Sequence, residues 1–270
     1  MAAFIRCFVW HNDNKIYFMK RQLIGKHKVT YYDSINELPI TRFHIYNRML
    51  LVDSGVGSSV SDFDSHLERI MAFLADKKSD DAIQELNNLR QNVYLIQNEL
   101  TPKHMAFAAI ITEIDGKQCN DISDEGLKTT LQLLKDVNIG TIDNEIEEAK
   151  KKIEEGLETY FPALFCDSSQ KEYYNLLIKR TKLVLKNILE GKDQSEELDR
   201  VTNELLTFSK PKSFEGEHSV ELAADRQFEK ICLIITEHLH CNPKQMTVME
   251  FYSAFDYLQE KMKKSNKKSA

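Results

Sequence analysis

Two histidines and two cysteines near the carboxy-terminal end of the sequence are of the types that ligate metal ions. They are His238, His240, Cys241 and, about two helical turns earlier, Cys232. A tetrahedral zinc site would need all four side chains to converge. On a helix His238 and His240 point about 200° apart, so they cannot share an ion unless the helix breaks between them. We therefore predict no metal site here.

A glycine-rich loop from Asp53 to Ser59 is a second place where chemistry could occur. Such loops can cradle a phosphate when they precede a helix, because free N–H groups point out of the helix start. This loop lacks the GK[ST] of a P-loop and does not match GxGxxG. Ser54, within DSGVG, does not fit the GxSxG elbow of a nucleophilic serine. We expect an ordinary turn between two helices.

Three acids and a histidine around this loop could act as an acid–base cluster: Asp53, Asp62, Asp64 and His66. Helix capping explains the acids more simply, since Asp62 or Ser61 can cap the helix that follows. No nucleophile, base and orienting group can be named together in the sequence. We therefore predict no catalytic residue, no bound cofactor and no enzymatic activity.

The composition predicts a mainly α protein, a multi-helix bundle with a small β-hairpin region at its N-terminus. Hydrophobic residues make up 42% and charged residues 29% of the chain, as in globular proteins. Only 9 Gly and 5 Pro are present in 270 residues, which favours long helices over many short strands.

The strongest helical pattern lies at the centre of the chain, from Asp80 to Ile114. Apolar residues three or four apart predict an apolar face on a first helix, at Ile83, Leu86, Leu89, Val93 and Ile96. Thr101 and Pro102 start a second helix, whose residues 105–111 are apolar on nearly every side and so should lie in the core. We predict that Asp80–Ile114 is a helical hairpin.

Helices are also predicted on both sides of this centre. A short one begins at residues 38–43 and ends at the Asp53–Ser59 loop, and the next one has an apolar face of Phe63, Leu67, Ile70, Met71 and Leu74. Ser123 should start a helix that ends near Val137 and is closed by Asn138. Thr141–Leu157 has a narrow apolar seam, which predicts a surface helix packed along one edge or, alternatively, an intersubunit coiled coil.

We divide the chain into a β-rich segment 1–36, a central helical domain 37–160, a helical hairpin 161–209 and a C-terminal helical unit 217–264. The expected strands contain clusters of β-branched and aromatic residues, with a turn at 11–14; these clusters are at 5–10, 16–18 and 29–32. Lys210–Gly216 is the predicted linker. The last helix, capped by Thr247, has a large aromatic face between Val248 and Leu258.

The distribution of charge limits the kinds of partner that the chain can bind. A net charge of −6 argues against general or sequence-specific nucleic-acid binding, which needs clustered Lys and Arg. The basic end, Lys261–Lys268, is interpreted as a solubilising terminus, with contact to an acidic partner or nucleic acid as the alternative.

No apolar run reaches the roughly 18 to 20 residues of a membrane span, and Phe4–Trp10 is too short for a signal peptide. Five scattered cysteines without a CxxC pair predict a reducing compartment.

Parts of the sequence resemble uncharacterised virion proteins of crAss-like tailed phages of Bacteroidota. The resembling segments are LPITRFHIYN at 38–47, LVDSGVG at 51–57, NNLRQN at 87–92 and TPKHMAFA at 101–108. Separately, NPKQMTVMEFY at 242–252 is similar to the C-terminal helix pair of small tailed-phage assembly and tail proteins. None of these segments is a catalytic motif.

The resemblance implies a non-enzymatic structural protein of the head–tail connector or tail, a ring or adaptor that forms homo-oligomers and contacts the portal or tail components. It would be assembled in the host cytoplasm and located in the virion. The β-rich start and the seam from Ile142 to Leu157 would then be intersubunit surfaces. The alternative is an assembly chaperone or scaffold that binds a partner helix through the aromatic face of Val248–Leu258.

Overall fold

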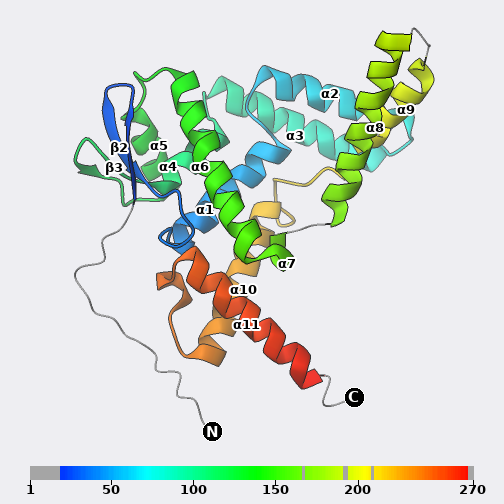
Figure 1. Cartoon of the computed structure of the whole chain (residues 1–270). Helices are drawn as coiled ribbons and strands as arrows, with labels where there is room; N and C mark the ends of the chain where they lie inside the picture. The colour runs from blue at the N-terminus through cyan, green and yellow to red at the C-terminus, as the bar shows by residue number, and fades with distance from the viewer. Residues whose placement is uncertain (1–18, 166–167, 191–193, 208–209, 267–270) are drawn as a thin grey trace.

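The structure is a computed structural model that describes residues 19–165, 168–190, 194–207 and 210–266. Within these ranges the protein is mainly helical with one small antiparallel sheet, so the predicted fold class is confirmed. In Figure 1 the sheet lies at one side of the molecule, and helices α2 (Val60–Ala75) and α3 (Ser79–Gln97) extend toward the other.

The sheet combines an N-terminal hairpin with a second hairpin from the middle of the chain. Its strands, in both chain order and spatial order, are β1 (Lys20–Ile24), β2 (His27–Tyr31), β3 (Ile111–Ile114) and β4 (Lys117–Gln118). Asp115 and Gly116 join β3 to β4 with φ of 51° and 85°. An Asp-Gly pair with two positive φ angles is typical of a two-residue hairpin turn, because its twist matches that of the strands.

The predicted N-terminal β-region is only partly within the described residues. Val29–Tyr31 lie in β2 as expected, and the hairpin packs on the helical core. Its partner strand is β1, which was not among the predicted clusters. The expected strands at 5–10 and 16–18 and the turn at 11–14 fall outside the described residues.

The predicted helical hairpin Asp80–Ile114 is wrong in two respects. Helix α4 (Pro102–Ile110) ends where the β-branched residues Ile111 and Thr112 begin, and these form β3 against the free edge of β2. Such residues fit a pleated, half-buried surface well. In addition, α3 packs along α2, whereas α4 packs along α1 (Ile40–Gly55).

The centre of the core is the α1–α4 pair, and α4 is buried on nearly every side as predicted. Arg42 of α1 is itself buried and donates hydrogen bonds to the carbonyl oxygens of Ala109, Ile111 and Cys119, at 2.9, 2.9 and 2.7 Å. These carbonyls surround the point where helix changes to strand. The Arg42 guanidinium therefore supplies donors that regular secondary structure cannot supply there.

Helices α5 (Asp124–Gln132) and α6 (Ile139–Tyr160) cover one side of this core. Ser123 caps α5 as predicted, but α5 ends at Gln132, and Asn138 caps α6 instead of closing the preceding helix. The apolar seam of α6 is buried against the chain itself, at Ile142, Ile146, Ala149, Ile153 and Leu157. This confirms the edge-packed helix and contradicts an intersubunit coiled coil through the same seam.

Three helices follow α6: α7 (Pro162–Phe165), α8 (Ser168–Glu190) and α9 (Ser195–Thr207). Helices α8 and α9 form the predicted hairpin, with Leu183 and Val201 buried, and α9 also lies along α2. The predicted turn at 191–193 is outside the described residues.

The C-terminal helices share the main core instead of forming a separate unit. They are α10 (Val220–Leu239), a short 3-10 turn (Pro243–Gln245) and α11 (Val248–Asn266). Val248 N–H donates to the Leu38 carbonyl at 2.9 Å, and Pro39 pairs with Thr247 in an isolated β-bridge. Thr247 caps α11 as predicted, in a capping box with Glu250.

The predicted linker Lys210–Gly216 is also part of the packed structure. The Phe214 ring is buried against Gly55, where there is no room for a Cβ atom. Val220 N–H donates to the Ser213 carbonyl at 2.8 Å. The segment is therefore anchored on α1 and at the start of α10, although its composition is that of a linker.

Candidate functional site

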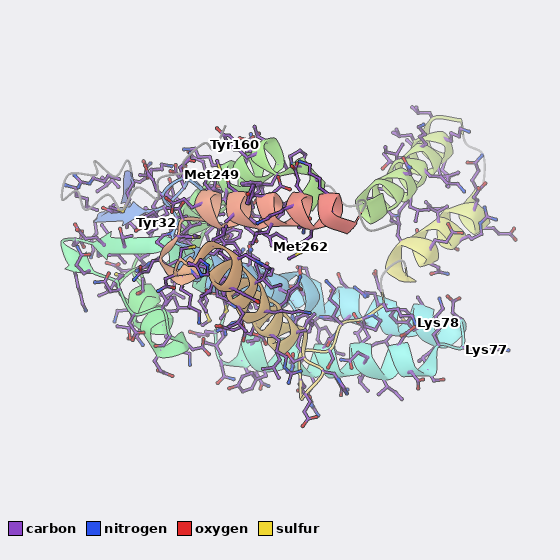
Figure 2. The ribbon with its side chains drawn as sticks, turned by 90° about the horizontal axis from the view of Figure 1, so that it is seen from below. Tyr32, Lys77, Lys78, Tyr160, Met249 and Met262 are labelled. Atoms are coloured by element: carbon purple, nitrogen blue, oxygen red, sulfur yellow. The ribbon has the colours of Figure 1, made fainter. Side chains whose placement is uncertain are left out.

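The α2–α3 hairpin exposes much of the apolar faces that were predicted on its two helices. Lys77 and Lys78 mark its turn at one end of the molecule, far from Tyr32 beside the sheet (Figure 2). Exposed apolar residues are Val60, Leu67, Met71 and Leu74 on α2 and Ile83, Leu86 and Tyr94 on α3. The predicted faces are therefore only partly covered: Leu89 is buried, and the half-buried members are Phe63, Ile70, Val93 and Ile96.

The inward faces of the hairpin combine buried apolar residues, among them Phe73 and Leu89, with polar residues that a hydrogen-bonded network joins. His66, Glu85, Asn88 and Asn92 are all buried, and Glu85 is only 1% exposed. Asn92 Nδ2 donates to the Val56 carbonyl at 3.0 Å. Buried polar groups are tolerated when they have such partners. Glu85, Asn88 and Asn92 recur every three or four residues, a polar stripe that could have signalled this inward face from the sequence.

His66 lies between two hydrogen-bond acceptors. Its Nδ1 is 2.7 Å from Glu85 Oε1, and its Nε2 is 2.8 Å from the Val56 carbonyl oxygen. A neutral imidazole has only one N–H, so both contacts are satisfied only by the charged imidazolium. Burial lowers the pKa of His66. The hydrogen bonds to Glu85 and Val56 raise the pKa by more than burial lowers it, so the net pKa lies above 6.5. Arg69 Nε, 3.1 Å from Glu85, shares the same carboxylate.

The predicted acid–base residues come together only in part. Asp53, Asp62 and His66 border one small cavity of about 80 Å³, whereas Asp64 is exposed on α2. Burial, followed by the nearby Asp62 charge, raises the pKa of Asp53. Ser59 is the N-cap of α2, and Asp62 at N3 completes a capping box with it, so capping by Asp62 is confirmed in this form and Ser61 is not the cap.

Asp62 also occupies the donors of the glycine-rich loop. The backbone N–H groups of Ser58 and Ser59 donate to its Oδ2 at 3.0 and 2.9 Å. These groups would have to bind a phosphate if the loop were a cradle. The first three residues of the loop, Asp53–Gly55, belong to α1. The structure thus supports an ordinary turn between two helices at Asp53–Ser59 and not a phosphate cradle.

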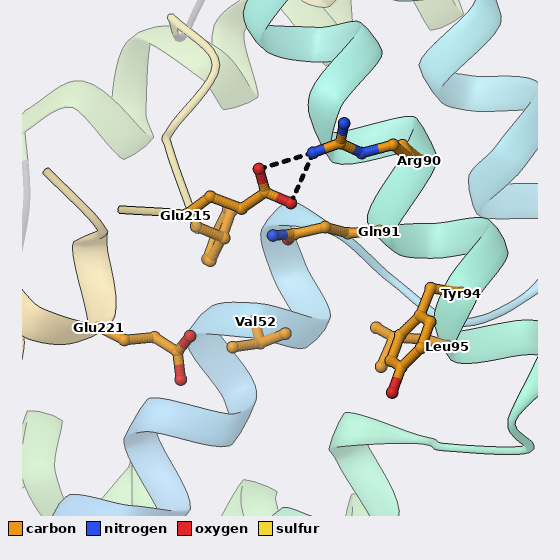
Figure 3. Close-up of a pocket in the computed structure, with 8 residues that line it drawn as sticks. Val52, Arg90, Gln91, Tyr94, Leu95, Glu215 and Glu221 are labelled. Carbon is orange, nitrogen blue, oxygen red and sulfur yellow. Dashed lines mark hydrogen bonds and ion pairs between the residues drawn. The ribbon is translucent and has the colours of Figure 1, made fainter. Parts of the chain in front are cut away.

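An apolar-lined pocket near the hairpin lies between α1, α3 and the start of α10 (Figure 3). It measures about 520 Å³ and is lined by Val52, Arg90, Gln91, Tyr94, Leu95, Phe214, Glu215 and Glu221. Arg90 Nη2 contacts both carboxylate oxygens of Glu215, at 3.0 and 2.8 Å. This ion pair ties the segment 210–216 to α3, and so creates a pocket that sequence reasoning missed.

The chemistry of this pocket suits an apolar side chain more than a reacting substrate. Burial raises the pKa of Glu221, and Arg48, 3.7 Å away, opposes that effect. Val52, Leu95 and Phe214 contribute apolar surface, and the charges of Arg90 and Glu215 satisfy each other at the rim. Such a pocket can hold part of a partner protein.

The four metal-ligand candidates do not form a site. Helix α10 ends at Leu239, and His240 adopts φ of 52° as its C-cap, so a helix break does lie between His238 and His240. Even so, no group of three or more His, Cys, Asp or Glu that could hold a metal ion occurs among the described residues.

The aromatic face of α11, the helix on which Met249 and Met262 are labelled in Figure 2, is mostly covered by the chain itself, whereas Tyr257 is 51% exposed. Val248, Phe251 and Leu258 are buried, and burial raises the pKa of Tyr252 to about 12. The basic end continues α11 as far as Asn266, and residues 267–268 lie outside the described ranges.

Within the described ranges, no helix combines the length and the apolar character that a membrane crossing requires. Comparisons with protein-family models, with curated proteins and with solved structures found no match. A functional proposal must therefore be argued from the fold and from the exposed surfaces of the chain.

Proposed function

We propose that this chain is a non-enzymatic structural component of a tailed-phage virion, a ring or adaptor protein of the head–tail connector or tail. In this role it forms a homo-oligomer and contacts other virion proteins. The observation that supports the proposal most directly is the outward apolar surface of α2 and α3.

This surface is unusual for a chain that acts alone. Single exposed apolar side chains are common, but contiguous apolar patches mark contacts with other proteins. Here two neighbouring helices expose their apolar stripes while they bury polar residues between them. A groove of about 590 Å³ on this face is lined by Phe63, Leu86, Leu89, Val93 and Tyr94 together with Asn87, Arg90 and Gln97.

The segments that resemble phage virion proteins are also neighbours in the fold. Residues 38–47 begin α1, which packs along the helix formed by residues 102–110. Residues 242–252 meet the same start of α1, where Ile40 N–H donates to the Met246 carbonyl at 2.9 Å. The two separate resemblances therefore include elements that meet at the start of α1.

The fold gives less support to the assembly-chaperone alternative. Its partner helix was expected to bind the aromatic face of α11, but that face packs on α1 and α10. An intersubunit role for the α6 seam is excluded in the same way, because the seam is buried within the chain. The outward face of α2 and α3 is the interface that we propose instead.

The proposal is tested by the native mass of the purified chain over a concentration series, followed by negative-stain images of the largest species. We expect a closed oligomer of defined size. If the chain stays monomeric both alone and with the portal and tail proteins of the same phage, the proposal is wrong. Turnover or specific binding of a nucleotide would also contradict it.

A further inference from the structure

Helices α2 and α8 present the same pattern of residues outward, with opposite charges. On α2 the pattern is Val60, Asp64, Leu67, Glu68 and Met71; on α8 it is Ile178, Lys182, Leu185, Lys186 and Leu189. Both sets follow the spacing i, i+4, i+7, i+8, i+11. All ten residues are exposed in the single chain.

The spacing places each set on one face of its helix. The apolar members are well exposed: 68% for Val60 and 63% for Met71, against 52% for Ile178 and 79% for Leu189. Apolar residues at this period form a seam that packs against a similar seam on another helix. Among the described residues, each of the two helices therefore lacks a partner for one face.

The charges within the seams are complementary. Asp64 and Glu68 on α2 occupy the positions that Lys182 and Lys186 occupy on α8. On both helices the charges lie on the same flank of the apolar residues, so the two acids face the two lysines when the helices run antiparallel. A contact between two α2 helices would bring acids together, and a contact between two α8 helices would bring lysines together. The pairing of α2 with α8 is therefore favoured.

The two seams do not meet within one chain. Helix α9 packs on α8 and also along α2, and both seams remain solvent-exposed in this arrangement. The occupant must therefore come from a second molecule that carries the complementary seam, and a second copy of this chain carries it.

We propose that α8 of one copy docks on the outward face of α2 in the next copy. The contact joins two different surfaces, so repetition is head-to-tail, and it closes into a ring if the rotation between copies allows. This inference rests on the proposed homo-oligomer, and it names the two surfaces that form its interface.

Charge reversal tests the contact in the full-length chain. One variant carries Asp64→Lys and Glu68→Lys, a second carries Lys182→Glu and Lys186→Glu, and a third combines all four substitutions. A matched control reverses two exposed charges on α11, Lys261→Glu and Lys263→Glu. Sedimentation over a concentration series gives the association constant, and circular dichroism with thermal unfolding verifies that each variant is folded.

We expect each double variant to associate about tenfold or more weakly than the wild type, because like charges then face each other. The fourfold variant and the control should associate as the wild type does. Assembly that is unchanged in both double variants, or that the fourfold variant does not restore, overturns the α2–α8 contact but leaves the ring proposal standing. A wild-type chain that never self-associates also overturns it, and binding to portal or tail proteins then decides the proposed function separately.

Discussion

His66 Nδ1 lies 2.7 Å from Glu85 Oε1, in a pair that joins α2 to α3 through side chains that are both buried. The pair holds the polar sides of the two helices together and leaves their apolar sides exposed. Arg69 contributes a further ion pair to the same carboxylate. The orientation of the hairpin, and with it the proposed interface, therefore depends on this network.

The charge of His66 makes stability depend on pH. Its pKa is raised in the folded state, so its stabilising contribution is complete below the ordinary value of 6.5 and is lost as the pH rises through the folded pKa. Denaturant unfolding at about pH 6 and about pH 9 should show the lower free energy of unfolding at the higher pH. His27, between Asp115 and Asp136, acts in the same direction. The His66→Gln variant isolates the effect: if its pH dependence equals that of the wild type, His66 is not responsible.

Removal of the Glu85 charge should destabilise the chain strongly. Glu85→Gln leaves the buried His66 cation and Arg69 without their carboxylate, which costs about 3 kcal/mol or more. Chemical denaturation measures this loss. Asp80→Asn, at an exposed acid on the same helix, is the matched control and should change stability by about 0.5 kcal/mol or less. Equal effects of the two substitutions would argue against the buried network.

Arg42 should be necessary at the junction of α4 and β3. Arg42→Met removes the donors to three buried carbonyls, and we expect the free energy of unfolding to fall by about 3 kcal/mol or more. Arg42→Lys keeps the charge but not the forked geometry, so its loss should be smaller but clear. Hydrogen exchange at Thr112–Ile114 would show whether β3 loosens first. A stable Arg42→Met variant with unchanged exchange would contradict this role.

Docking of the segment 210–216 should be sensitive to a single methyl group. In Gly55→Ala the new Cβ collides with the Phe214 ring and displaces the segment from α1. We expect faster limited proteolysis within 210–216. Adding Phe214→Leu to Gly55→Ala should relieve the collision and slow cleavage again. Wild-type cleavage rates in Gly55→Ala would mean that Phe214 does not pack there.

The apolar seam of α6 should contribute to the free energy of unfolding of the monomer. Ile153 is buried within the chain, so Ile153→Ala is expected to cost about 3 kcal/mol even at concentrations where no oligomer forms. An intersubunit seam would instead make the loss depend on protein concentration. Unfolding measured at two widely separated concentrations distinguishes the two cases.

Local chemistry in the sequence determined the helical class and several element boundaries. Thr101 and Pro102 place the start of α4, Ser123 places the start of α5, and Thr247 with Glu250 starts α11. These signals depend on residues within one helical turn, so no distant contact is needed to interpret them. The burial of α4 could be predicted as well, because a helix without a polar face must be enclosed.

Only the tertiary structure decided which faces are covered. An apolar stripe shows that a helix has two unlike sides, but it does not show whether the chain itself or another molecule covers the apolar one. On α3 the polar side is buried because Glu85 meets His66 and Asn92 meets the Val56 carbonyl, and these partners are distant in sequence. The same long-range contacts explain why Ile111–Ile114 is a strand and why Phe214 anchors a linker-like segment: each depends on a surface that another part of the chain supplies.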